Sequence, residues 1–165
     1  MTDPERSCSG TAVAVLIFAA MTAGLIYRYW PSEERSIRRH LSNLAEAISI
    51  PSTDSEVARI TRFAALREYF APDVRIGLDG QEIVSRETLI GQLSQWKPPP
   101  GGVVVEFVDV KVALAAGDTA LVNLTAKAST TNPTTGESTL DQRNADLAMV
   151  KLAGDWVISS ATARE

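Results

Sequence analysis

The sequence is poor in the residues from which several common sites are built. Its 165 residues include one cysteine, Cys8, and one histidine, His40. A single cysteine excludes a disulfide framework within the chain, and one histidine without further cysteines excludes the common zinc-binding patterns. No glycine-rich loop leads from a strand pattern into a helix pattern, as phosphate-binding loops require. We therefore expect no metal and no cofactor.

An excess of positive charge is also lacking. The chain carries 16 lysines and arginines against 20 acidic residues, for a net charge of -4, and the basic residues are scattered. Sequence-independent binding of nucleic acid needs a basic patch or stripe, so we expect no nucleic-acid partner. With 45% hydrophobic and 22% charged residues, the composition is typical of one globular domain and not of a disordered chain.

What the sequence does contain, near its start, is one long uncharged stretch from Thr11 to Tyr27. With its uncharged neighbours it approaches the roughly 20 residues that a helix needs to cross about 30 Å of hydrocarbon. We therefore predict a transmembrane helix. The predicted organisation is a short polar tail (1–9), a transmembrane helix (10–30) and a soluble domain (31–165).

A cleaved signal peptide is the alternative interpretation of this stretch. Such a peptide has a basic leader and a small-residue cleavage site after its apolar part. Here the leader carries Asp3 and Glu5 beside Arg6, and the apolar part runs into Tyr29 and Trp30, as at a membrane interface. These features favour an uncleaved anchor.

The basic residues around the anchor indicate which side of the membrane the domain faces. Arg6 and the amino terminus precede the uncharged stretch, whereas arginines follow that stretch at positions 28, 35, 38 and 39. Because basic flanks are retained on the cytoplasmic side, this count favours a cytoplasmic domain.

Two amphipathic helices are predicted after the anchor. Ser32 is a suitable N-cap for the first, which Pro51 ends, and its apolar residues recur at helical spacing: Ile37, Leu41, Leu44 and Ile48. Asp54 offers the N-cap of the second, which continues to the Ala71-Pro72-Asp73 break. The apolar residues of the second helix are Val57, Ile60, Phe63, Ala64 and Phe70.

The rest of the domain reads mainly as strands. Asp79-Gly80 is a dipeptide typical of a two-residue hairpin turn and separates strands predicted at 74–78 and 81–84. Ser85 then caps a third short helix that contains Leu89, Ile90 and Leu93. Beyond a proline- and glycine-rich loop, short turns join four long segments that must be antiparallel neighbours. These strands are predicted at 103–114, 119–129, 140–152 and 156–163.

The fold class is therefore α+β, in the order α-α-β-β-α-β-β-β-β, with helices packed on a strongly curved antiparallel sheet that forms a cone. Over residues 34–164 the chain resembles the nuclear transport factor 2-like superfamily, which includes the SnoaL-like proteins and has a cystatin-like α+β fold. The segments that carry the resemblance, besides the element order, are Tyr69 to Val74, Gly80 to Glu87, Gly117 to Ala120 and Lys151 to Ile158.

The resemblance implies where chemistry would take place if the protein were an enzyme. In the enzymes of this superfamily an Asp or His inside the cone acts as general base, and a Tyr or an acid stabilises an oxyanion. The candidates here are His40, Tyr69, Asp109, Arg143 and Asp146. No position matches a catalytic motif of the family well enough to carry a role over, so the catalytic residues are not assigned.

Each candidate also has a purely structural interpretation. His40 would be a partly buried helix residue and Tyr69 a packed aromatic. By strand alternation, Asp109 shares a face with Val105, Phe107 and Lys111, and could form an exposed cross-strand ion pair. By the same rule Arg143 shares a face with Asp141, whereas Asp146 lies on the opposite face with Asn144.

Two functions follow from this architecture. The first is a membrane-anchored, non-catalytic domain that binds a small apolar ligand or a protein partner, which could be a second copy in a homodimer. The alternative is a small-molecule isomerase, dehydratase or cyclase with an acid or histidine base in the cone. Because no convincing acid–base pair is found, the first is preferred.

Overall fold

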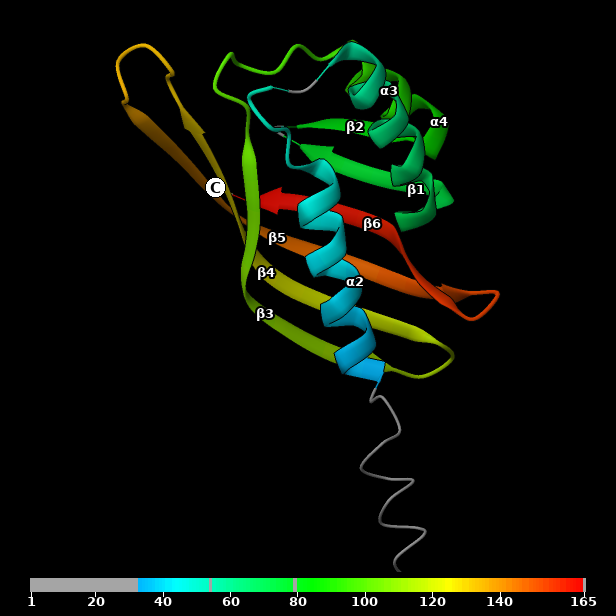
Figure 1. Ribbon diagram of the computed structural model, residues 1–165. Coiled ribbons are helices and arrows are strands. Elements are labelled where there is room, and N and C mark those ends of the chain that lie inside the picture. Colours follow the sequence, from blue (N-terminus) through cyan, green and yellow to red (C-terminus); the bar gives the residue numbers. More distant parts are fainter. Residues whose placement is uncertain (1–32, 54, 79, 165) are drawn as a thin grey trace, which may run out of the picture. The chain divides into compact units, whose positions relative to one another are not determined.

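The computed structural model describes residues 33–53, 55–78 and 80–164, which form three α-helices, a short 3-10 helix and six strands (Figure 1). The predicted anchor at 10–30 and its neighbour Ser32 lie outside the described residues. Within these ranges, no helix is both long and apolar enough to cross a membrane. The order of the described elements matches the predicted α-α-β-β-α-β-β-β-β series.

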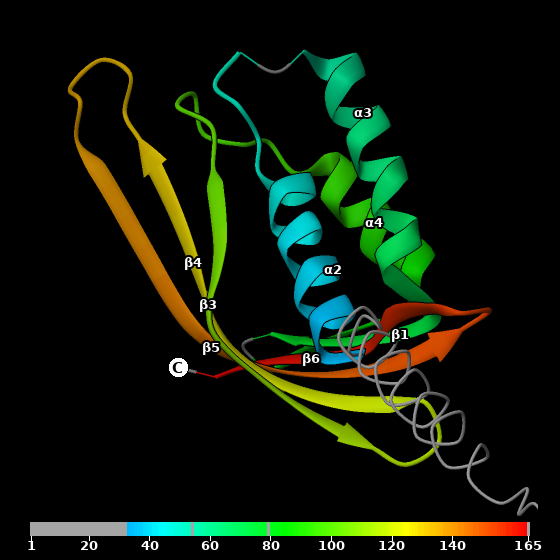
Figure 2. The same ribbon diagram turned by 60° about the horizontal axis from the view of Figure 1, so that its bottom comes forward.

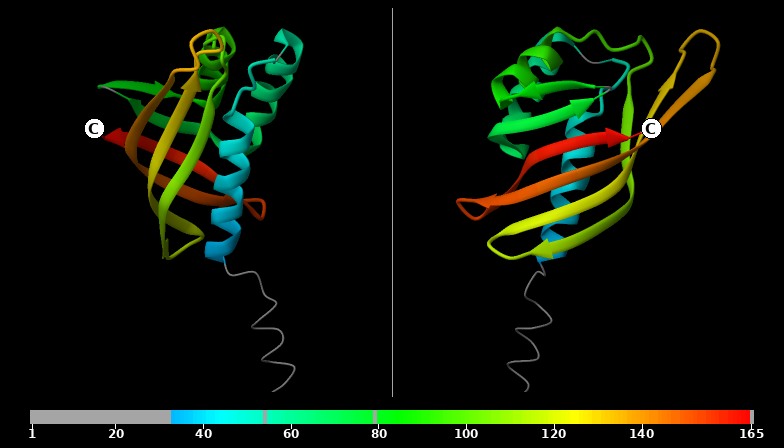
Figure 3. Two further views of the ribbon diagram at one scale, coloured as in Figure 1. Left: turned by 60° about the vertical axis from the view of Figure 1, so that its left-hand side comes forward. Right: turned by 180° about the vertical axis from the view of Figure 1, so that it is seen from behind.

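The first described helix, α2 (Glu33–Ile48), packs against the concave face of the sheet (Figure 3). Ile37, Leu41 and Leu44 are buried as their spacing predicts, because residues three and four apart share one face of a helix. Ser49 follows the helix and ties it to the sheet. Its hydroxyl donates to the carbonyl of Ala45 (2.7 Å) and accepts from the backbone N–H of Val105 (2.9 Å).

The second helix is shorter than predicted. Helix α3 (Glu56–Ala65) is capped by Ser55, whose hydroxyl accepts from the N–H of Ala58 at 3.2 Å. It passes into the 3-10 helix η1 (Leu66–Tyr69), and Phe70 already begins the first strand. Of the apolar residues that predicted this helix, Phe63 is buried whereas Val57 and Ile60 are exposed.

The strand that starts at Phe70 was predicted to start at Val74. Strand β1 (Phe70–Leu78) accommodates Pro72 because the pairing with its neighbour shifts between Phe70 and Arg75. A proline without an N–H is tolerated at such an irregularity. The hairpin to β2 (Gln81–Val84) is confirmed, with Leu78 paired to Gln81. Ser85 caps α4 (Arg86–Gln95), as predicted.

The four long strands are β3 (Val104–Ala115), β4 (Thr119–Thr131), β5 (Ser138–Leu152) and β6 (Asp155–Arg164). They pair antiparallel in chain order, which confirms the predicted meander. The sheet order is β2-β1-β6-β5-β4-β3, however, and β1 is parallel to β6. The sheet is therefore mixed and not purely antiparallel as predicted, because β1 and β6, which are far apart in the sequence, pair in the same direction.

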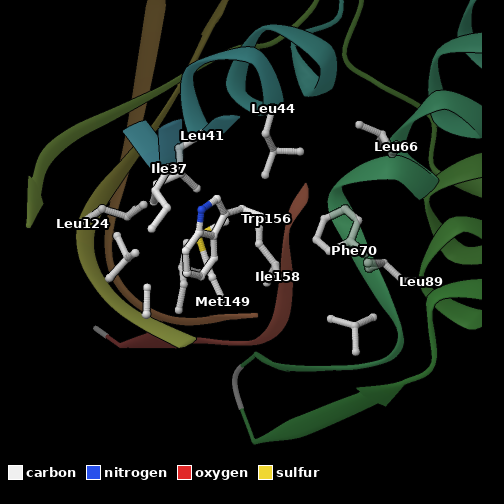
Figure 4. Packing of buried hydrophobic residues seen from close by; sticks show 14 of the residues in the cluster. Ile37, Leu41, Leu44, Leu66, Phe70, Leu89, Leu124, Met149, Trp156 and Ile158 are labelled. Atoms are coloured by element: carbon white, nitrogen blue, oxygen red, sulfur yellow. The ribbon is translucent and has the colours of Figure 1, made fainter. Parts of the chain in front are cut away.

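The sheet bends strongly, and α2 lies in the bend (Figure 2). The core fills the space between helices and sheet: Figure 4 shows Met149, Trp156 and Ile158 of the sheet facing Ile37 and Leu41 of α2. Trp156, the second residue of β6, is buried in this core. The core also includes Leu66 of η1, Phe70 of β1 and Leu89 of α4, so it extends beyond α2 to the other helices.

Candidate functional site

The concave face of the sheet is buried under α2 but partly open beyond it. Strand register places apolar side chains there in two short rows, since Ile83 pairs with Ile76 and Ile76 with Ala161, whereas Ala126 pairs with Phe107. All are partly buried and pack against the core cluster. We call these side chains, together with Ala145 of β5, the concave patch: Ile76, Ile83, Phe107, Ala126, Ala145 and Ala161.

The small side chains of the concave patch come from three adjacent strands. Ala126 lies on β4, Ala145 on β5 and Ala161 on β6, each on the face that the helices cover. Alanine is short, so a surface built from it recedes between the larger isoleucines and Phe107. Such an apolar, partly accessible surface suits contact with a hydrophobic molecule.

One charged pair borders the concave patch. Arg143 pairs with Ala126 across the β4–β5 ladder, and Asp141 pairs with Ala128, so both charged residues lie on the concave face. The Arg143 Nε and Asp141 Oδ2 atoms are 3.5 Å apart. The shared face predicted for Arg143 and Asp141 is therefore confirmed.

Asp146 lies on the outer face of the sheet, as predicted. It accepts a hydrogen bond from the Asn123 side chain and forms an ion pair with Arg164. The neighbouring Thr125 hydroxyl donates to Asn144 Oδ1 at 3.1 Å. Asp146 and Arg143 point to opposite sides of the sheet, so the two residues do not form a common site.

The predicted position of Asp109 is wrong. The β3–β4 register shifts between Val108 and Lys111, and Asp109 has a backbone φ of +53°. This bulge reverses the alternation beyond it, so Val110 and Val112 face the core while Asp109 and Lys111 are exposed. A bulge adds one residue to one strand only, and strand alternation counted from the sequence does not reveal it.

His40 and Tyr69 are the two candidates that the structure brings together. Their ring centroids are 4.8 Å apart, and both rings line a hollow of about 540 Å³ between α2, η1 and the β5–β6 turn. His40 is half-buried at the edge of the helix face that meets the sheet, beside this hollow and not within the concave patch. None of Asp109, Arg143 and Asp146 lines the hollow.

The environment of His40 favours its neutral form. Burial lowers the pKa of the imidazole below its usual range, and the Asp155 carboxylate and a hydrogen bond with the Tyr69 backbone only partly oppose this. The Nε2 atom is buried without a hydrogen-bond partner. A neutral imidazole can accept a proton, which is the chemistry that a general base requires.

A polar contact that the sequence did not reveal lies at the start of α2. The Lys151 ammonium and the Trp156 indole N–H each donate to the Glu33 carboxylate at 2.7 Å. These hydrogen bonds lower the pKa of Glu33, and the bond to Glu33 raises the pKa of Lys151. In sequence alone, Glu33 stands out only as an acid in the first turn of a helix.

Among the described residues, no group of three or more histidine, cysteine, aspartate or glutamate side chains is arranged to hold a metal ion. The two candidate sites are the concave patch on one face of the sheet and the histidine–tyrosine pair in a separate hollow.

The sequence profile of the SnoaL-like domain family matches residues 55–162. No curated protein matches the sequence. Among solved structures, the association domain of CaMKII from C. elegans is similar with a TM-score of 0.64 and 16% identity, covering 81% of this chain and 96% of that one.

Two bacterial structures are also similar. One is assigned as a scytalone dehydratase from Novosphingobium aromaticivorans, with a TM-score of 0.63 and 14% identity, covering 80% of this chain and 83% of that one. The other is an NTF2-like protein of unknown function from Pseudomonas putida, with a TM-score of 0.58 and 17% identity, covering 80% and 85%. At these identities the similarity shows the fold alone.

Proposed function

The chain belongs to the SnoaL-like domain family, and from this premise we propose that it is a membrane-anchored, non-catalytic domain that binds a small apolar molecule on its concave patch. The observation that carries the proposal is the composition of that patch. Its alanines and isoleucines are partly accessible and continuous with the core. Among the described residues, Thr125 is the one buried polar residue, and it lies on the outer face.

The membrane anchor is part of the proposal. Its support is the uncharged stretch from Thr11 to Tyr27, which is followed within two or three residues by Tyr29 and Trp30. Arginines follow this stretch more often than they precede it, which supports a cytoplasmic domain. An apolar ligand that partitions into the bilayer would then be concentrated close to the domain.

A larger side chain in the concave patch tests ligand binding. The full chain in detergent is titrated with steroid, polyketide and lipid-like compounds, and tryptophan fluorescence reports the affinity. For any compound that binds, Ala145→Phe is expected to raise the dissociation constant at least about tenfold, because the added ring occupies the ligand's position. Ala148→Phe is the matched control, since Ala148 lies on the outer face of the same strand, opposite Leu121.

Equal affinity in the Ala145→Phe variant and the parent chain would contradict binding at the concave patch. Loss of affinity in both alanine variants would indicate general unfolding, so circular dichroism of each variant accompanies the titration. A panel in which no compound binds would also contradict the small-ligand proposal.

In the second form of this proposal, the non-catalytic domain binds a protein partner or a second copy of the chain instead of a small molecule. Leu121 lies exposed on the outer face between Ala113 and Ala148, which gives that face an apolar spot near the β3–β4 turn. The similar CaMKII structures are association or hub domains by name. Self-association of the full chain in detergent, measured by sedimentation, distinguishes this form from ligand binding.

The catalytic alternative is supported by a different observation. The His40 imidazole, whose lowered pKa favours its neutral form, packs at a tilt against the Tyr69 ring at the hollow, and a similar structure is assigned as a dehydratase. The same compounds are therefore analysed for dehydration or for a shifted double bond. Product formed by the parent chain and lost in His40→Gln would favour this alternative over the non-catalytic domain.

A further inference from the structure

Two hairpin turns of the domain end in apolar tips. The β3–β4 turn reads Leu-Ala-Ala-Gly-Asp from Leu114 to Asp118, and the β5–β6 turn reads Leu-Ala-Gly-Asp from Leu152 to Asp155. Leu114 is 53% exposed and Leu152 is 45% exposed. We call these two turns the leucine tips. Each presents a leucine and one or two alanines to the outside.

The leucine tips lie at the end of the domain where α2 begins (Figures 1 and 3). Glu33, the first residue of α2, accepts hydrogen bonds from Lys151 and Trp156, which flank the β5–β6 turn. The backbone N–H of Lys151 donates to the carbonyl of Asp118 in the β3–β4 turn at 2.9 Å. These contacts hold both tips beside the point at which the preceding chain enters the domain.

The opposite end of the same strands is polar. The β4–β5 hairpin covers residues 130–139, and eight of these ten residues are threonine, serine, asparagine or glutamate. The other two, Pro133 and Gly136, suit turns. The two ends of the sheet therefore differ in polarity. Leucine and alanine lie in the turns at one end, whereas mainly hydroxyl side chains lie in the hairpin at the other end.

The few residues between the predicted anchor and α2 limit how far the leucine tips can lie from the membrane. If residues 10–30 span the bilayer, Trp30 lies at the headgroup level. Two residues, Pro31 and Ser32, separate Trp30 from Glu33, and even fully extended the three residue steps between them reach only about 10 Å. We infer that the leucine tips rest in the interfacial layer of the bilayer in which the chain is anchored. This inference rests on the membrane anchor of the proposed function.

The charges at this end indicate that the contact is apolar and not electrostatic. The basic residues are Arg35, Arg38, Arg39 and Lys151, and the acidic residues are Glu33, Glu34, Asp118 and Asp155. Among the described residues at this end, four charges of each sign leave no net attraction for anionic headgroups. Contact with the bilayer should therefore persist at high salt and in membranes of zwitterionic lipid.

The test measures how close each leucine tip lies to the bilayer, with a single fluorescent label placed at one residue per variant. In the full chain with Cys8→Ser, a single cysteine is introduced as Leu114→Cys, Leu152→Cys or Leu140→Cys and labelled with NBD. Leu140 is the matched control, because it is 60% exposed but lies at the polar end of the sheet. The proteins are reconstituted in phosphatidylcholine vesicles with and without doxyl-labelled lipid.

We expect doxyl lipid to quench the labels at 114 and 152 at least about threefold more than the label at 140, in low and high salt alike. Equal quenching at all three positions would overturn the inference, as would quenching that appears only with anionic lipid. Extraction of the chain by alkaline carbonate would instead show that the anchor itself is wrong. If the chain resists extraction and the tip labels remain in water, only the inference fails.

Discussion

His40 is held by its neighbours in the form that carries no charge. It packs against Tyr69 at 4.8 Å between ring centroids, and burial is the main cause of its lowered pKa. The unfolded chain therefore binds the proton more readily than the folded chain does. Proton binding to the unfolded state makes the free energy of unfolding fall as the pH drops.

The pH dependence of stability follows directly. Between about pH 7.5 and pH 5, the free energy of unfolding of the full chain in detergent is expected to fall, starting near the usual histidine pKa of about 6.5. Urea unfolding at several pH values measures it. In His40→Gln this decline should flatten over the same range. A variant that declines as steeply as the parent would contradict the assignment to His40.

At the scale of elements, the loop between α4 and β3 is held against the loop after α2 by close backbone contact. Ile50 and Val103 exchange two hydrogen bonds, at 2.7 and 2.8 Å. Gly102 lies beside them with a φ of +74°, and a Cβ atom there would be 2.3 Å from the Ile50 carbonyl oxygen. Glycine alone satisfies both the left-handed backbone and this approach.

Gly102→Ala should therefore destabilise the domain by about 2–5 kcal/mol. The left-handed strain contributes about 1–2 kcal/mol, and displacement of the packed backbone about 1–3 kcal/mol. Gly136→Ala is the matched control, because Gly136 has a φ of +73° but nothing within 4 Å of its Cβ position. Urea unfolding compares the two variants. Equal losses would show that the close approach to Ile50 is unimportant.

At the scale of the whole molecule, Glu33 joins the two ends of the domain. It lies 118 residues from Lys151 and 123 from Trp156, and it accepts a hydrogen bond from each. The carboxylate must be ionised and the ammonium protonated. Because the pKa of Glu33 is lowered, the stabilisation from this ion pair is lost as the pH falls through the pKa of Glu33. Because the pKa of Lys151 is raised, the same stabilisation is lost as the pH rises through the pKa of Lys151.

Glu33→Gln is expected to lower the free energy of unfolding at neutral pH modestly, because the amide still accepts one hydrogen bond but no longer pairs with the charge. The difference from the parent chain should shrink at high salt, which screens accessible ion pairs. Glu34→Gln serves as control, since Glu34 pairs with Arg38 on its own helix. A larger effect in the control would contradict a special role for Glu33.

Local patterns in the sequence determined most of the elements. The spacing of Ile37, Leu41 and Leu44 predicted α2, Ser85 marked the start of α4, and short turns implied the antiparallel meander. Alternation also placed Arg143 and Asp146 on opposite faces of β5. Each of these features depends on residues that are close in the chain, so the sequence is sufficient to predict it.

Contacts between distant residues decided the rest. The parallel pairing of β1 with β6, the bulge at Asp109 and the contact between His40 and Tyr69 all depend on segments that are remote in the chain. A bulge shifts the alternation by one residue, so every residue beyond it changes face. The candidate residues could be named from the sequence, but only the packing of the sheet and helices determined which of them meet.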